Sequence, residues 1–237
     1  MCKLKKDLYG LKQAPRAWYG RIDSFLAILG FTKSKVDSNI YFKVMNDEPL
    51  ILLLYVDDLF STREEKFITK CKKKLTTEFE MKDLGLMHYF LGLEVWQSLE
   101  KIFLNQGKYA IEILKRFDML ECKSMNTPME TKLKLMVDTS SELIDVMMYR
   151  WIIGSLMNLT NTRLDICFAM NILSQFLVEP RRVHLVVAKH MMRYLKGTLD
   201  CGLSYDGGHD FKLSGYTNSD WAGSVSDMKS TSGCFFT

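Results

Sequence analysis

Hydrophobic residues in the first hundred positions alternate between helical and strand-like spacing. Five apolar residues recur every three or four positions within 14–31, which predicts a helix that ends near Gly30. Two apolar runs, 38–44 and 49–56, are separated by the turn-rich stretch "MNDEP", which is typical of paired strands. The pattern then predicts a further helix and a second strand pair, namely 64–79, 87–98 and 101–106.

The middle of the chain is helical in pattern, and strand-like spacing returns after residue 200. One predicted helix has a capping-box-like start, with Thr162 followed three residues later by Asp165, and ends before Pro180. Because strand-like spacing returns, we place a domain boundary near residue 205. The chain stops within an apolar, strand-like run, so we expect a last domain that is cut short. The helices predicted here are 107–119, 148–160, 163–180 and 181–198.

Composition narrows the class of protein. The chain has 237 residues, of which 47% are hydrophobic, and a net charge of +4, which allows a polyanionic partner without requiring one. Six scattered cysteines without a CxxC pair argue against a zinc site or a disulfide scaffold. The first residues lack the apolar segment of a signal peptide, and the longest apolar run is far shorter than the roughly 20 residues of a membrane span. We therefore expect an intracellular protein that is neither secreted nor bound in a membrane.

Asp57 and Asp58 interrupt the apolar run "ILLLYVDDLF". A buried carboxylate is costly, and two adjacent carboxylates repel each other. One interpretation is a surface turn, although no Gly or Asn is present to supply the positive φ that tight two-residue turns prefer. The other is a strand end that presents carboxylates to Mg²⁺, as two-metal phosphoryl transfer requires. The residues alone leave both interpretations open.

The segment between Glu179 and Asp200 contains no acidic residue. Four of its cations are spaced 7, 4 and 3 positions apart and therefore share one helix face. Such a face is either solvated or tracks the phosphates of a nucleic acid. The four cations are Arg182, Lys189, Arg193 and Lys196.

Several long motifs, in order along the chain, resemble the copia-type LTR retrotransposon Pol polyprotein. They are "DLYGLKQAPRAWY", "YVDD", "FEMKDLGLMHYFLGLEV", "GSLMNLTNTRLDI", "RYLKGTLDCGLSY" and "DWAGSVSDMKSTSG", which together span essentially the whole chain. The resemblance implies an α+β fold: a partial right-hand polymerase, with a palm hairpin and a helical thumb and connection, followed by a truncated ribonuclease H-like β segment. The implied domains are 1–105 (partial reverse transcriptase palm), 106–204 (thumb and connection) and 205–237 (ribonuclease H-like start).

The resemblance also implies the site residues. Asp57 matches the metal-binding Asp of the "YVDD" motif and Asp58 its second Asp, in an enzyme that uses two Mg²⁺ ions, an RNA template, a DNA primer and deoxynucleoside triphosphates. "GLKQAP" resembles the segment that lines the nucleotide pocket and template; the alternative is an ordinary basic loop that opens a helix. "FLGLEV" resembles the primer grip, whereas the residues alone favour a strand bulge at its glycine. The nucleotide and template residues so implied are Gly10, Lys12, Gln13, Pro15, Arg16 and Tyr55, and those of the primer grip are Leu91 and Gly92.

The sequence departs from the family at informative positions. The family's other metal-binding Asp lies in a strand upstream of "YGLKQAP", and this chain begins after it, so we expect no polymerase activity from the chain alone. Asn218 stands where the first ribonuclease H metal carboxylate belongs, and a neutral amide cannot offset the charge of a metal pair. We therefore expect no ribonuclease H activity either. Asn158 and Leu164 stand where the family usually has Tyr and Pro.

The sequence thus predicts a fragment of an RNA-directed DNA polymerase from a transposable element. By family, it would act beside the rest of the Pol polyprotein, in cytoplasmic virus-like particles or in the nucleus. One alternative is a nucleic-acid-binding remnant without catalysis that uses Lys12, Arg16 and the basic helix; another is a pseudogene product. Primer extension with Mg²⁺ separates the first function from the others, and salt-dependent binding separates the second from the third.

Overall fold

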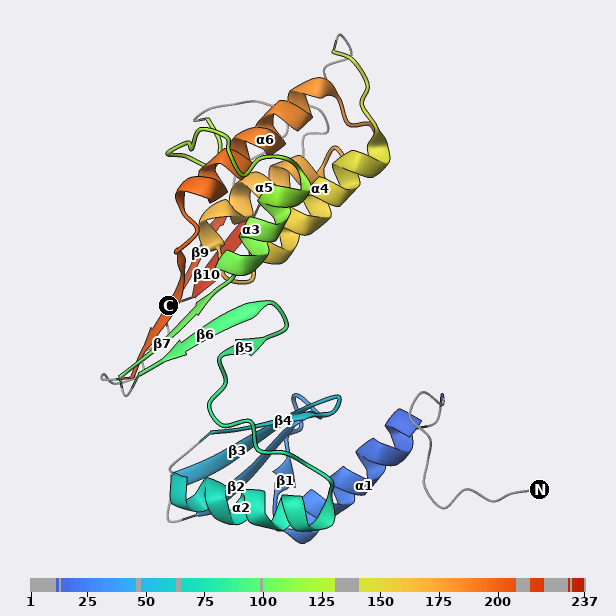
Figure 1. Ribbon diagram of the computed structural model, residues 1–237, viewed down its shortest axis with the longest axis vertical. Helices are drawn as coiled ribbons and strands as arrows, with labels where there is room; N and C mark the ends of the chain where they lie inside the picture. Colours follow the sequence, from blue (N-terminus) through green and yellow to red (C-terminus); the bar gives the residue numbers. More distant parts are fainter. Residues whose placement is uncertain are drawn as a thin grey trace, which may run out of the picture. The chain divides into compact units, whose positions relative to one another are not determined.

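The computed structural model divides into two compact units, 1–85 and 86–237 (Figure 1). The described residues are 12, 14–45, 48–62, 65–98, 100–130, 141–207, 214–219, 230 and 232–236.

In its described part, the first unit is an antiparallel sheet in the order β1-β2-β3-β4, with two helices. Buried residues alternate along β3, where Leu50, Leu52 and Leu54 face the core. Helices α1 and α2 supply the other side of that core, so both cover the same face of the sheet. The elements are α1 (Ala14–Ile28), β1 (Thr32–Lys33), β2 (Ile40–Met45), β3 (Glu48–Tyr55), β4 (Asp58–Thr62) and α2 (Glu65–Glu78).

Helix α1 ends as the sequence predicts. Gly30 has φ +82, and its N–H donates to the Ala27 carbonyl while the Phe31 N–H donates to that of Leu26. This pair of bonds is a Schellman motif, in which glycine takes the left-handed position without a Cβ penalty. Phe31 and Leu26 are both buried, which adds the hydrophobic contact that often accompanies the motif.

The described residues of the second unit form a four-stranded antiparallel sheet, β5-β6-β7-β8, a separate β9–β10 pair and four α-helices. Its hydrophobic core comes from the helices. Tyr149 of α4 is fully buried and donates its hydroxyl to the Leu173 carbonyl, while His184 of α6 stacks on Phe176 with ring centroids 3.9 Å apart. The elements are β5 (Tyr89–Phe90), β6 (Leu93–Gln97), β7 (Lys101–Asn105), α3 (Gly107–Arg116), α4 (Val146–Leu159), the 3-10 helix η1 (Leu164–Ile166), α5 (Cys167–Ser174), α6 (Arg182–Gly197), β8 (Gly202–Asp206), β9 (Gly215–Ser219) and β10 (Ser232–Phe236).

Two local predictions are wrong. The predicted strand 87–98 is broken into β5 and β6 by a turn at Leu91–Gly92. The predicted helix 163–180 is a 3-10 turn followed by the short helix α5, and no capping box forms. Instead the Thr162 hydroxyl donates to the Gln106 side chain, 2.9 Å away, because both groups are buried and satisfy each other.

The fold class is α+β, since antiparallel sheets are combined with separate runs of helices. None of the helices in the described part of the chain is long and apolar enough to cross a membrane.

Candidate functional site

Strands β3 and β4 form the hairpin that carries the "YVDD" motif. Their register pairs Leu54 with Leu59 and Tyr55 with Asp58, which leaves Val56 and Asp57 as a two-residue loop. Asp57 therefore lies in the turn, and Asp58 begins β4. The paired strands therefore form an antiparallel hairpin with both carboxylates at its tip.

The turn forms without the glycine or asparagine that such turns prefer. Val56 takes φ +52, whereas Asp57 has no positive φ, which is the pattern of a type II′ turn. The argument that these residues disfavour a tight turn is therefore wrong. A β-branched residue is rarely found in the left-handed region, and such strain costs about 1–3 kcal/mol unless the surroundings hold it.

Both carboxylates face solvent. Asp57 and Asp58 are exposed, and neither makes a hydrogen bond or ion pair with another described residue. Strand alternation places Asp58 and Tyr55 on the face of the sheet opposite the buried side chains of β3. Oxygen donors of this kind suit Mg²⁺, although the described residues contain no cluster of three His, Cys, Asp or Glu side chains around the turn or elsewhere.

Trp18 touches the turn from helix α1. Its indole Nε1–H donates to the Val56 carbonyl oxygen, 3.0 Å away. The sequence interpretation placed Trp18 only on the apolar face of a helix. Nothing in the spacing distinguishes it from a core residue, because the contact joins positions 38 residues apart.

Tyr55, one of the residues predicted to contact nucleotide and template, ends β3, and the other described ones lie around the start of α1. Pro15 is in its first turn, where the missing N–H costs nothing, and Lys12 and Arg16 are exposed. Gly10 and Gln13 lie outside the described residues. Helix α1, which begins at Ala14, contacts the "YVDD" turn through Trp18.

The predicted primer-grip residues form the β5–β6 turn. Phe90 pairs with Leu93, and the two residues between them both have positive φ, +49 for Leu91 and +84 for Gly92. This is the pattern of a type I′ turn, which requires positive φ at both central positions. The bulge expected at Gly92 is therefore a turn, and Leu91 is 59% exposed at its tip.

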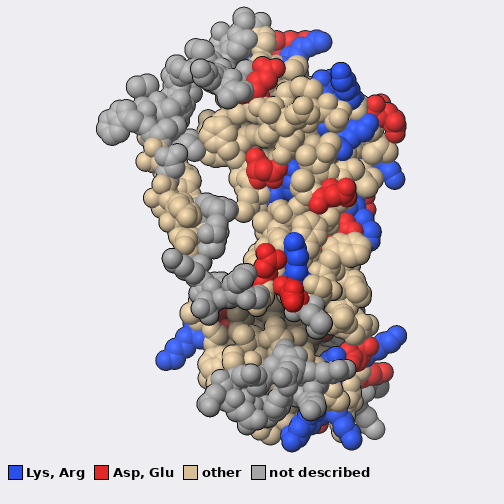
Figure 2. Space-filling view, turned by 90° about the vertical axis from the view of Figure 1, so that its left-hand side faces the viewer, with Lys and Arg blue, Asp and Glu red and all other residues tan. Residues whose placement is uncertain are grey.

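The four cations of the basic helix differ in their surroundings. Lys196 donates to the Cys122 carbonyl, 2.6 Å away, and Arg182 approaches Glu142 at 3.5 Å. Lys189 and Arg193 are exposed, and neither side chain has a partner among the residues that the structure describes. On the face shown in Figure 2, basic and acidic side chains are interspersed rather than gathered into one patch.

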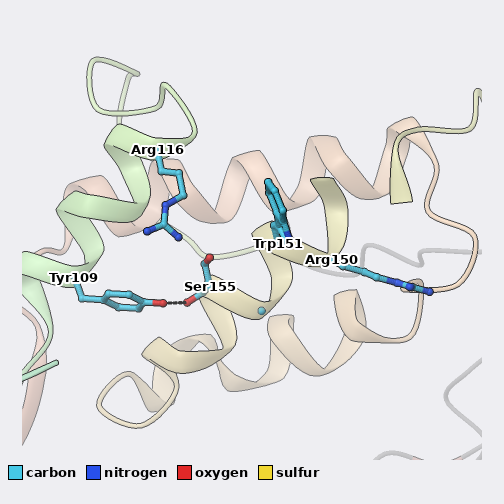
Figure 3. A pocket seen from close by; sticks show the side chains of 6 residues that line it. Tyr109, Arg116, Arg150, Trp151 and Ser155 are labelled. Atoms are coloured by element: carbon cyan, nitrogen blue, oxygen red, sulfur yellow. Dashed lines mark hydrogen bonds between the residues drawn. The ribbon is translucent and has the colours of Figure 1, made fainter. Parts of the chain in front are cut away.

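A shallow cleft of about 550 Å³ lies between α3 and α4 (Figure 3). Arg116 points across it toward Ser155, and the Tyr109 hydroxyl lies 3.3 Å from the Ser155 carbonyl oxygen. Trp151 flanks the cleft with 66% of its surface exposed. Arg116 has no partner among the described residues, and a Cβ added at Gly154 would face open space among the residues that the structure describes.

The remaining predicted position, Asn218, lies in β9, where it pairs with Gly233 of β10. The two other departures from the family pattern are on the surface. Asn158 is exposed and accepts a bond from the Asn161 side chain, and Leu164 is 46% exposed. Neither places an unsatisfied polar group in the core.

Comparison with known proteins agrees with these features. The family model for reverse transcriptase (RNA-dependent DNA polymerase) matches residues 1–131. The chain is 38% identical over 98% of its length to the retrovirus-related Pol polyprotein from transposon RE1 of Arabidopsis thaliana, and 40% identical over its whole length to that from transposon TNT 1-94 of Nicotiana tabacum. A putative transposon Ty5-1 protein of Saccharomyces cerevisiae is 34% identical over 99% of this chain and 77% of its own length.

The chain belongs to the reverse transcriptase family. Within that family it is a reverse transcriptase-like segment of a retrotransposon Pol polyprotein of the copia type. It spans 16% and 19% of the two plant polyproteins, so it corresponds to less than a fifth of either. No solved structure matches the chain.

Proposed function

We propose that this chain supplies the palm turn of an RNA-directed DNA polymerase, with Asp57 and Asp58 as ligands of two Mg²⁺ ions. The observation that carries the proposal is the hairpin, which holds two exposed carboxylates at one tip, neither of them paired with another described residue. A bound Mg²⁺ pair would activate the primer 3′ oxygen and neutralise the charge that develops on the transferred phosphoryl group. The protein's part is to hold these oxygens on a rigid strand pair.

The other expected contacts follow from the same proposal. Lys12 and Arg16 would bind phosphates of the nucleotide or template, beside Gly10, Gln13 and Pro15, with Tyr55 near the primer end. The Leu91–Gly92 turn would serve as the primer grip. In the proposed right-hand architecture, residues 1–105 are palm, 106–204 are thumb and connection, and 205–237 begin a ribonuclease H-like domain.

We also propose that the 237-residue chain alone does not extend a primer. Its two carboxylates come from adjacent residues of one turn and reach a metal pair from one side only. Two-metal transfer must hold the incoming triphosphate and the attacking oxygen together, which calls for a further ligand from another direction. With Asn218 in β9, we likewise expect no cleavage of an RNA–DNA hybrid.

Primer extension by a fusion tests the site. A copia-type fingers-and-palm segment is joined upstream of Met1, and extension is measured with Mg²⁺. We expect activity that falls by more than about a hundredfold with Asp57→Asn, since loss of a group that merely orients a metal ligand already costs about 10–100-fold. Asp37→Asn, an exposed aspartate in another turn of the same unit, is the matched control. Equal activity of the Asp57→Asn and control fusions would overturn the assignment.

A second candidate function is nucleic-acid binding without catalysis, favoured by the α3–α4 cleft. Exposed aromatic rings stack on unpaired bases and arginine pairs with phosphate, so Trp151 and Arg116 suit a single strand.

Binding of a labelled single-stranded oligonucleotide to the 237-residue chain tests this candidate. Trp151→Ala should weaken binding, whereas Trp96→Ala, which removes a similarly exposed tryptophan from β6, should not. The logarithm of the binding constant falls with the logarithm of the salt concentration, and Arg116→Gln should make this slope shallower by about 0.7, compared with the neighbouring control Lys115→Gln. Equal effects of each variant and its control would exclude the cleft.

A further inference from the structure

The peptide group between Val56 and Asp57 is the central peptide of the "YVDD" turn. Rotation of this peptide interconverts the two families of two-residue hairpin turns, which differ in the sign of φ at the second residue. That residue is Asp57, and aspartate tolerates the left-handed region. The alternative type I′ turn is therefore accessible to this sequence, and it would change the direction of the Asp57 carboxylate.

Trp18 holds the carbonyl oxygen of that same peptide. The 3.0 Å bond from its indole Nε1–H fixes which way the Val56 carbonyl points. The indole is itself held, since it packs edge-on against Phe79 with ring centroids 5.3 Å apart. Phe79 is buried and also contacts Phe25 and the Arg21 guanidinium. The hydrogen-bond donor is thus fixed by the core formed by α1 and α2.

We propose that Trp18 is a positioning residue that selects the type II′ turn at Val56–Asp57 and so aims the Asp57 carboxylate. Type II′ turns favour glycine at the first central position, where this chain has valine at φ +52. The turn residues therefore do not select this geometry by themselves. The hydrogen bond supplies the selection from outside the hairpin. This inference rests on the proposed metal-binding role of Asp57.

Trp18→Phe removes the N–H donor while it keeps one aromatic ring against Phe79, and the rescue variant below separates the hydrogen bond from the lost packing. The readouts are the Mn²⁺-induced broadening of the amide signals of residues 55–59 and the three-bond coupling between the Asp57 Hα and the Val56 carbonyl carbon, which is large only when the φ of Asp57 is positive. We expect Mn²⁺ affinity at the turn to fall about fivefold, the value of one hydrogen bond, and Asp57 to populate positive φ.

Val56→Gly in the Trp18→Phe background is the rescue. Glycine favours the first position of a type II′ turn, so the double variant should recover the affinity and coupling of the wild-type chain. A loss caused by general unfolding would not be rescued in this way. Tyr19→Phe, which removes the neighbouring hydroxyl bonded to the Ser38 carbonyl, is the matched control and should leave both readouts unchanged.

The outcomes separate the two proposals. Suppose that Asp57→Asn abolishes the Mn²⁺-induced broadening. The positioning role is then wrong, while the metal site stands, if Trp18→Phe leaves both readouts at wild-type values. The same conclusion follows if Trp18→Phe lowers the Mn²⁺ affinity and Val56→Gly does not restore it. If Mn²⁺ broadens the amide signals of the Asp57→Asn variant as much as those of the wild-type chain, the metal site is wrong and the positioning role fails with it.

Discussion

Arg163 is almost fully buried, with 4% of its side chain exposed. Its guanidinium donates to both carboxylate oxygens of Asp165, at 2.9 and 2.7 Å, and to the Thr198 carbonyl at 2.8 Å. The Tyr194 hydroxyl also donates to Asp165, at 2.6 Å. Although burial opposes ionisation, these hydrogen bonds lower the pKa of Asp165 below its ordinary value. The "TRLD" stretch thus anchors the start of α5 to the end of α6.

Asp165→Asn should destabilise the second unit by about 3 kcal/mol, because it leaves the buried Arg163 charge without its counter-ion. Denaturant unfolding measures the change, with the exposed substitution Glu112→Gln on α3 as control. Adding Arg163→Met should restore part of the loss, since no buried charge then remains. A double variant less stable than Asp165→Asn would show that the other Arg163 bonds dominate.

Helix α1 is attached to the sheet by a polar cluster as well as by its apolar face. The Tyr41 hydroxyl of β2 donates to Asp23 of α1 at 2.6 Å, and Lys33 of β1 approaches the same oxygen at 3.1 Å. The hydrogen bond from Tyr41, with help from Lys33, lowers the pKa of Asp23 below its usual 3.8. Burial raises the pKa of Tyr41, which therefore stays a neutral donor.

The lowered pKa of Asp23 predicts acid sensitivity of this attachment. A carboxyl whose pKa is lower in the folded state stabilises the fold above its unfolded pKa, and this contribution is lost as pH falls through the folded value. Asp23→Asn should therefore cost about 1 kcal/mol at neutral pH, and the difference from wild type should shrink below pH 3.8. Amide hydrogen exchange of α1, followed as a function of pH, measures the stability difference between Asp23→Asn and wild type. The exposed substitution Glu80→Gln is the control. A pH-independent difference would contradict the argument.

On the face shown in Figure 2 the surface charge is mixed, so a phosphate-tracking face there must be local. Lys196 is engaged with a backbone carbonyl, and Arg182 faces an exposed glutamate. Lys189 and Arg193 are the two members of the basic helix best placed to release counterions from a duplex, because neither has a partner among the described residues.

Replacing Lys189 and Arg193 together by glutamine should weaken the salt dependence of duplex DNA binding. The slope of log binding constant against log salt concentration should become shallower by up to about 1.8, at about 0.9 for each contact. Lys196→Gln should instead loosen the segment around Cys122 and leave the slope nearly unchanged. Lys73→Gln with Lys74→Gln on α2 removes the same charge elsewhere. An equal slope change in that control pair would mean that α6 is merely a solvated face.

The sequence by itself determined most elements of this protein. Periodicity located α1, the two hairpin strands and the helices of the second unit, because burial of one face repeats with the local geometry of helix or strand. Gly30 marked the end of α1 because its requirement for positive φ is local. The family motifs identified Asp57 and Asp58 as candidate ligands, and the hairpin places both at its tip.

Only the tertiary structure decided how that turn is built and which polar groups are buried. Val56 has an unfavourable φ, and its carbonyl oxygen accepts a hydrogen bond from Trp18, which lies 38 residues away in the sequence. Thr162 does not cap a helix but donates its hydroxyl to Gln106, 56 residues away. No local pattern encodes these contacts, since they depend on which surfaces meet after the chain has folded. The physical reason is that a buried polar group takes whatever partner the packed core brings within hydrogen-bond distance, regardless of its separation along the chain.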